Sequence, residues 1–270
     1  MIRILLVTFA FFACVGAFAV PTGLSYKPAS LPDVTSPELS DPQWRWLGRK
    51  RELVLAIYGP ARPPVSRIAP TQALTGYVAD FAWTTARSLG LTLRVMHFSG
   101  AAEAYAALDE GDVDVVFSPA GDSVPPRFAP EEILTVAGAH PVRVIRRSNP
   151  PDDRHMVFSP AGADSPGQLL ASLDEGNIAS VTLPAGEAYY LTERNYVNSL
   201  EISRVEDVSM SPYRFVTGKR EPLLTEALGK AVDNLRFSPA GELLATRWDK
   251  RNLTRFISAP LNLTHEEESW

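Results

Sequence analysis

The stretch AALDEGDVDVVF, residues 106–117, ends a short apolar-faced helix and starts a β-branched run within a few residues. Gly111 stands at the turn between them, the position where a helix most often ends on glycine. A near copy, ASLDEGNIASV, occupies residues 171–181. Two copies of one helix-to-strand unit predict a chain built from two similar lobes.

The composition is that of an ordinary globular protein. The chain has 270 residues, 45% hydrophobic and 21% charged, and a formal net charge of −5. This length suffices for one large or two small cores. The sequence contains no block of basic residues, so we expect no nucleic-acid partner.

The N-terminus has the pattern of a secretory signal peptide. Met1-Ile2-Arg3 is positive, residues 4–16 are apolar, and Ala17-Phe18-Ala19 has the small-x-small pattern of a cleavage site. We therefore predict a signal peptide at 1–19, cleavage after Ala19 and a periplasmic protein; a buried N-terminal helix is the alternative. No later run approaches the roughly 20 apolar residues of a membrane span, so we expect none in the mature chain.

The position of the cysteine limits the functions that we expect of the mature chain. The single cysteine, Cys14, lies inside the predicted signal peptide. The mature chain is thus expected to have neither a disulfide nor a cysteine nucleophile.

Strands and helices alternate through the first half of the mature chain. Residues 53–58 form a continuous apolar run, as in a buried parallel strand, and residues 91–98 and 113–117 also read as strands. Helices are predicted between them at 76–89 and 101–108. This β-α-β-α-β order predicts an α/β fold with an open sheet and helices on both faces.

The second half is less regular. Extended segments are predicted at 142–145, 178–183, 200–205 and 213–216, and helices at 167–173, 186–196, 222–235 and 241–248. Residues 20–42 and 149–153 are rich in Pro and polar residues and read as a lead-in and a linker.

Several motifs, in order, resemble the family 3 periplasmic solute-binding proteins. LTGYVADF at 74–81 is similar to the strand-to-helix entry of that family, and residues 107–114 are similar to its "aL..G.iD" segment. Residues 223–248 are similar to its C-terminal helices. The resemblance, which covers about residues 43–250, implies a two-lobed periplasmic-binding-protein (Venus flytrap) fold.

A narrower resemblance is to the first periplasmic flytrap domain of BvgS-type hybrid sensor histidine kinases. It rests on WRWLGRKR at 44–51 and on LTHEEESW at 263–270, whose Leu-to-Trp spacing repeats that of residues 39–46. The tail would then resemble the start of a second flytrap domain, with the span and the kinase absent from this sequence. A truncated gene and a fragment both fit this pattern.

The resemblance also implies domain boundaries. Lobe 1 would comprise residues 43–139 plus 212–255, lobe 2 residues 140–211, and the lead-in and the tail residues 20–42 and 256–270. Lobe 2 is short, because the strand-helix unit that usually opens it is not recognisable. Its copy of the junction has Ala179 where the first copy has Asp114.

A flytrap binds its ligand between the lobes, at the carboxyl ends of the strands. This rule places Tyr58 with the loop 59–66, residues 118–127 and residues 182–187 around the cleft, with Ser118 and Thr182 as candidate ligand residues. The resemblance implies an Arg for a ligand carboxylate, because its planar fork binds carboxylates bidentately. Arg127 lies in the matching loop, with a surface role as the alternative. Glu187 is the candidate partner of a ligand amino group, since Pro184 replaces the usual acid.

Enzymatic functions have little support in the sequence. His97, His140, His155 and His265 are scattered without metal-ligand spacing, and no G-x-S-x-G occurs. We therefore expect no catalytic residues, cofactor or metal, although Glu187 or Glu103 would be the candidates in an enzyme on this scaffold.

The sequence thus predicts a sensory or solute-binding domain whose ligand is a small acid or amino-acid-like molecule. Its partner would be a neighbouring flytrap domain or sensor protein. The alternatives are a free component of an ABC-type uptake system and an interaction module without a small ligand.

Overall fold

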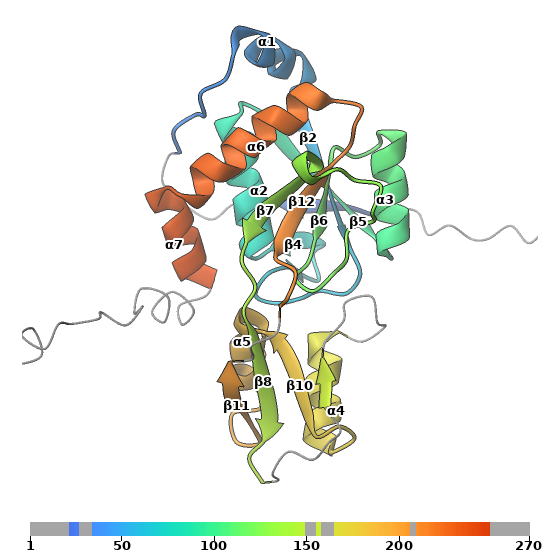
Figure 1. Cartoon of the computed structure of the whole chain (residues 1–270), viewed down its shortest axis with the longest axis vertical. Coiled ribbons are helices and arrows are strands. Elements are labelled where there is room, and N and C mark those ends of the chain that lie inside the picture. Colours follow the sequence, from blue (N-terminus) through green and yellow to red (C-terminus); the bar gives the residue numbers. More distant parts are fainter. Residues whose placement is uncertain (1–21, 27–33, 149–154, 158–164, 206–208, 249–270) are drawn as a thin grey trace, which may run out of the picture.

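The computed structural model describes residues 22–26, 34–148, 155–157, 165–205 and 209–248. These residues form two lobes, one above the other in Figure 1. One lobe holds an eight-stranded sheet of order β3-β4-β1-β5-β2-β6-β12-β7, and the other a four-stranded sheet of order β11-β8-β10-β9. The predicted two-lobed α/β fold with a smaller second lobe is confirmed.

Three parallel strands form the centre of the first sheet. They are β2 (Glu52–Tyr58), β5 (Thr92–Phe98) and β6 (Val115–Ser118). Leu55 of β2 pairs with Val95 on one side and with Val115 on the other, both in parallel. The continuous apolar run of β2 is buried on both faces, as predicted for a central parallel strand.

The other strands of this sheet lie outside the central three. On the β6 side, β12 (Tyr213–Thr217) and β7 (Ile133–Ala137) pair antiparallel. On the β5 side come β1 (Thr22–Tyr26), β4 (Ala73–Thr75) and β3 (Arg67–Ile68).

Strand β1 differs from the expectation for residues 20–42. We expected these residues to precede the lobe as a lead-in, but residues 22–26 are part of its sheet, where Leu24 pairs antiparallel with Val95. Leu24 and Tyr26 pack against the core, and the Tyr26 hydroxyl donates to the Asp80 carboxylate at 3.1 Å. Pairing with two distant strands cannot be read from local composition, which explains the wrong prediction.

Helices cover both faces of the first sheet (Figure 1). Helices α2 (Tyr77–Ser88), α6 (Pro222–Arg236) and α7 (Pro239–Trp248) pack into the main core on one face. Helix α1 (Asp41–Lys50) lies against α6, where its Gln43 side chain donates to Glu226 at 3.1 Å. Helix α3 (Ala101–Glu110) covers the other face with a second cluster. No helix among the described residues is long and apolar enough to cross a membrane.

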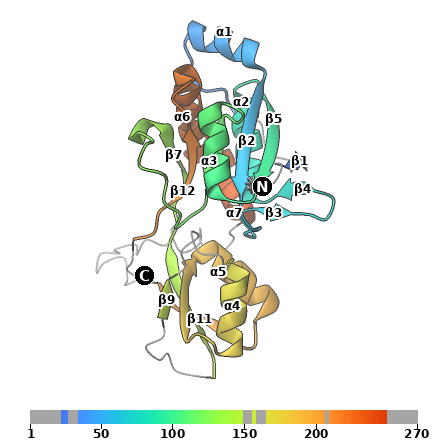
Figure 2. The same ribbon diagram turned by 90° about the vertical axis from the view of Figure 1, so that its right-hand side faces the viewer.

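The second lobe is a small sheet with two helices (Figure 2). Its central strands are β8 (Pro141–Arg146) and β10 (Ser180–Pro184), flanked by β11 (Leu200–Val205) and β9 (His155–Val157). Helices α4 (Pro166–Glu175) and α5 (Ala185–Asn195) share one core with this sheet. Strand β9, which pairs parallel with β10, was not predicted, because it is short and lies in a Pro-rich stretch.

Candidate functional site

The two lobes meet where their central strands end. In the first lobe β2 ends at Tyr58 and β6 at Ser118, and in the second lobe β10 runs straight into α5 at Pro184. This junction of the two lobes is where the flytrap resemblance placed a ligand site.

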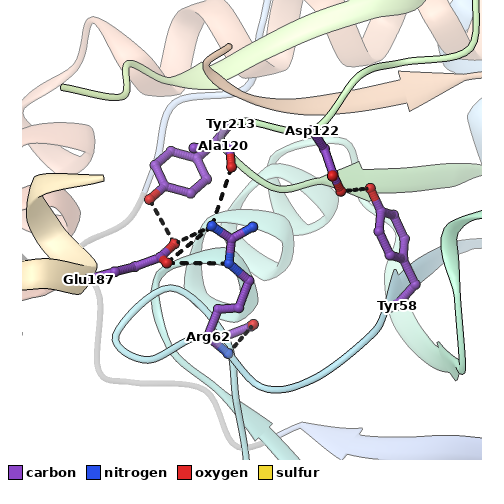
Figure 3. A network of polar contacts seen from close by, with 7 residues as sticks. Tyr58, Arg62, Ala120, Asp122, Glu187 and Tyr213 are labelled. Carbon is purple, nitrogen blue, oxygen red and sulfur yellow. Dashed lines mark hydrogen bonds and ion pairs between the residues drawn. The ribbon is translucent and has the colours of Figure 1, made fainter. Parts of the chain in front are cut away.

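A buried ion pair joins the lobes at this place (Figure 3). Arg62, in the turn after β2, contacts Glu187 in the first turn of α5, with Nη2 2.9 Å from Oε1 and 3.1 Å from Oε2. Arg62 Nε also donates to Oε2 at 3.3 Å. The Glu187 side chain is 0% exposed and that of Arg62 is 5% exposed, so the pair lies entirely inside the protein.

Two further contacts complete this group. The Tyr213 hydroxyl, at the start of β12, donates to Glu187 Oε1 at 3.1 Å, and Arg62 Nη2 donates to the Ala120 carbonyl at 3.3 Å. We call Arg62, Glu187 and Tyr213 the interlobe bridge. Arg62 and Tyr213 belong to the first lobe and Glu187 to the second.

Removing only one charged residue of the bridge is expected to destabilise the folded protein. Burial raises the pKa of Glu187, while Arg62 and the Tyr213 hydroxyl oppose this rise by stabilising the carboxylate. The N-terminal end of α5 also favours a negative charge there. Removing one partner of such a buried pair costs about 3–5 kcal/mol, because the other charge stays buried without compensation.

A second polar group lies beside the bridge in the first lobe. The Tyr58 hydroxyl donates to the Asp122 carboxylate at 2.5 Å, and Arg214 Nη2 donates to the Asp122 carbonyl. Burial raises the pKa of both Tyr58 and Asp122. The Tyr58 phenol therefore stays neutral and can donate its proton in the hydrogen bond to Asp122.

The predicted site residues fall into three positions. Tyr58 and Glu187 belong to these two polar groups. Ser118 and Thr182 are wholly buried within β6 and β10. Arg127 lies elsewhere: its side chain is half exposed, pairs with Asp109 of α3 at 2.8 Å and stacks over the Phe128 ring.

Sequence reasoning did not select Arg62, Asp122 or Tyr213. Arg62 had a usable signal, because it stands in the loop GPARPPVS, residues 59–66, directly after a buried parallel strand. Asp122 had the same kind of signal, because it lies in the segment 118–127 that follows β6. Tyr213 had none, since only the tertiary fold brings it to this place. Among the described residues no group of three or more His, Cys, Asp or Glu side chains has the arrangement of a metal site.

Two sensor proteins are similar to this chain in sequence, although no protein-family profile matches it. The sensor protein EvgS of Escherichia coli O157:H7 is 28% identical over 262 residues, which cover 86% of this chain and 21% of EvgS. The virulence sensor protein BvgS of Bordetella pertussis is 34% identical over 88 residues, 33% of this chain and 7% of BvgS. The chain thus spans about a fifth of the length of EvgS.

Solved structures agree on the fold. The B. pertussis BvgS periplasmic domain matches with a TM-score of 0.67 at 22% identity, over 85% of this chain and 48% of that one. The BvgS VFT2 domain matches with a TM-score of 0.64 at 16% identity, over 79% of this chain and 99% of that one. An ancestral amino acid-binding protein, described as a precursor of cyclohexadienyl dehydratase, matches at 0.57 and 14% identity, over 76% and 99% of the two chains. The chain is homologous to the BvgS and EvgS sensor proteins and has the fold of a periplasmic Venus flytrap domain.

Proposed function

We propose that this chain is the sensory input domain of a two-component sensor, and that it responds through the relative placement of its two lobes. The interlobe bridge carries the proposal. A buried ion pair whose partners belong to different lobes makes the lobe arrangement depend on one contact, Arg62 with Glu187. A ligand shifts such an equilibrium only by binding one arrangement more tightly than the other.

The ligand class that fits this contact is a small acid or an amino-acid-like molecule. A guanidinium binds carboxylates through paired hydrogen bonds, and Arg62 already does so with a carboxylate of its own chain. A ligand carboxylate would take the place of Glu187 on Arg62. Arg62 therefore replaces Arg127 as the proposed acid-binding residue, and Tyr58, Ser118 and Thr182 remain candidates at the strand ends.

The proposed domain has no catalytic activity. Glu187, the sequence candidate for an acid or base, is engaged by Arg62 and Tyr213. Glu103 accepts hydrogen bonds from the backbone and side chain of Ser99 at the surface, where it caps the start of α3. Each carboxylate is thus held in contacts within its own chain, an arrangement that favours binding over catalysis.

We also propose export to the periplasm, the location of the BvgS domain that the fold matches. The predicted signal peptide and its cleavage after Ala19 fall outside the described residues, as does the tail at 256–270. Mass spectrometry of the protein from a periplasmic extract tests this step. A chain that begins at Val20 supports it, and a chain that keeps Met1 to Ala19 contradicts it.

A panel of small acids and amino acids tests the ligand proposal by thermal shift. We expect at least one compound to raise the melting temperature of the wild type in a saturable manner. The same compound should have no effect on Arg62→Ala and an undiminished effect on Arg127→Ala, which loses only a surface ion pair. Binding lost in Arg127→Ala and kept in Arg62→Ala would contradict the assignment.

A second candidate, an interaction module without a small ligand, is favoured by one observation. Arg62 is already engaged through Nε and Nη2 by Glu187 and by the Ala120 carbonyl, so a ligand that binds through these atoms must displace an internal partner. If no compound shifts the wild type or Glu187→Gln, where the competing carboxylate is gone, this candidate replaces the first.

A further inference from the structure

A cavity of about 190 Å³ lies at the hinge, where the chain passes between the lobes. Tyr77 and Trp248 line it from the first lobe and Gly186 from the second. His140 lines it from the segment between β7 and β8, which crosses between the lobes, and Tyr213 from the start of β12. The cavity is separate from the Arg62–Glu187 contact, but it shares one residue, Tyr213, with the interlobe bridge.

The walls of this hinge cavity are apolar even where they contain polar residue types. The Trp248 indole N–H donates to the Asp80 carboxylate at 2.7 Å, and the Tyr213 hydroxyl donates to Glu187. The Tyr77 hydroxyl reaches the Val136 carbonyl at 3.5 Å. The polar ends of all three aromatic side chains are therefore engaged outside the cavity, which leaves their rings to form its surface.

Charge also limits what this cavity accepts. None of its lining residues is Asp, Glu, Lys or Arg. Burial lowers the pKa of His140, so its imidazole is neutral at pH 7. A charged ligand would lose its hydration there without gaining a partner, which disfavours the acids proposed for the bridge.

We propose that the hinge cavity is a second binding site, which takes a small uncharged aromatic molecule. Its size fits this class, since an apolar cavity of roughly 150 Å³ holds benzene. Aromatic walls favour an aromatic occupant, because offset-stacked and edge-to-face ring pairs add to the gain from burial. The proposal does not require an acid ligand at the bridge.

Occupancy of this site acts on the lobe arrangement. Residues of both lobes and of the crossing segment 138–140 line the cavity, so an occupant contacts all of them only while they keep this arrangement. Binding there consequently stabilises the arrangement in which Arg62 meets Glu187. The occupant is an effector of lobe placement and does not contact Arg62 or Glu187, neither of which lines the cavity.

Indole is the probe for a calorimetric titration of the full chain. We expect saturable binding at one site. Ala245→Phe and Ala139→Phe place a ring into the cavity from α7 and from a crossing segment, and each should weaken binding at least tenfold. Leu243→Phe adds the same bulk to the outer face of α7, where Leu243 is 54% exposed, and should change the affinity less than twofold.

Three results would overturn the proposal. One is no saturable heat up to the solubility limit of indole. Another is wild-type affinity in both Ala139→Phe and Ala245→Phe. The third is binding only by a chain that ends at residue 250, since the residues after Trp248 would then be the natural occupant of the cavity.

A scattering measurement tests the effect on lobe placement. In Arg62→Ala, which lacks the ion pair, we expect a larger radius of gyration than in the wild type and a decrease when indole is added. Indole that binds this variant without changing its radius of gyration would refute the coupling.

Discussion

The two helix-to-strand junctions, one in each lobe, have nearly identical local structures. Gly111 has φ 86° and ψ 14°, and Gly176 has φ 86° and ψ 13°. In both, the residue after the glycine donates its N–H to the carbonyl five residues earlier, at 2.9 Å. An arginine guanidinium also lies over each glycine, Arg220 at Gly111 and Arg146 at Gly176.

The junctions differ at the third residue after the glycine. In the first, this residue is Asp114, which accepts the Val54 N–H at 2.7 Å and pairs with Lys50 at 2.7 Å, so the junction is tied to β2 and α1. The second copy has Ala179 at this position and makes no such side-chain tie. The second lobe is instead joined to the first through Glu187. The two junctions therefore have the same local structure but differ in how they are attached to the rest of the protein.

The interlobe bridge should show the largest effect. Arg62→Ala leaves the Glu187 carboxylate buried without its partner, and we expect the free energy of unfolding to fall by about 3–5 kcal/mol. Urea denaturation measures the loss. The double replacement Arg62→Met/Glu187→Leu should lose less than Arg62→Ala, because two apolar side chains leave no buried charge.

Hydrogen exchange then locates the effect. Amides of β10 and α5 should exchange faster in Arg62→Ala, while those of β2 and β5 keep their protection. Equal acceleration in both lobes would show that the bridge does not anchor the second lobe in particular.

Asp114→Ala tests the anchor of the first junction. Its loss leaves the buried Val54 N–H without an acceptor and Lys50 without its closer partner, so we expect a cost of about 2 kcal/mol. Asp114→Asn keeps an acceptor and should cost less than Asp114→Ala. If both variants have the same free energy of unfolding as the wild type, the difference between the two junctions does not contribute to stability.

The glycines test the similarity of the junctions. Gly111→Ala and Gly176→Ala each place a Cβ on a left-handed residue, at a cost of about 1–2 kcal/mol. Gly176→Ala should cost slightly more, because its Cβ would meet the Arg146 guanidinium at 2.7 Å, against 3.5 Å from Arg220 at Gly111. Thermal melts of the two variants give the comparison, and a neutral result at either position would contradict the shared geometry.

Changing the pH should give the smallest effect. Because burial raises the pKa of Glu187 in the folded protein, the folded state binds this proton more tightly than the unfolded state. The contribution of Glu187 to stability is then fully present below its ordinary pKa, about 4.3, and is lost as pH rises through the raised value. For one group the slope is at most about 1.4 kcal/mol per pH unit.

The difference in unfolding free energy between the wild type and Glu187→Gln, measured from pH 4 to pH 8, isolates this term. The wild type should lose stability relative to Glu187→Gln as the pH rises. A difference that is independent of pH would show that the pKa of Glu187 is the same in both states.

Local sequence determined much of this protein. The apolar run of β2, the alternation of strands and helices and the two glycine junctions are properties of neighbouring residues, and they suffice to predict two α/β lobes. The flytrap fold was implied by the resemblance of the ordered motifs to family 3 solute-binding proteins. They also placed Tyr58 and Ser118 at strand ends, because the carboxyl ends of parallel strands lie at one edge of a sheet.

The tertiary structure alone decided which side chains meet. Arg62 and Glu187 are 125 residues apart in sequence, and β1 joins the sheet by pairing with β4 and β5, to which no local pattern assigns it. Arg127 had the right residue type in the right loop, yet it pairs with Asp109 at the surface. Residue type and spacing predict elements because these depend on near neighbours, whereas the partner of a buried charge depends on how the two lobes pack against each other.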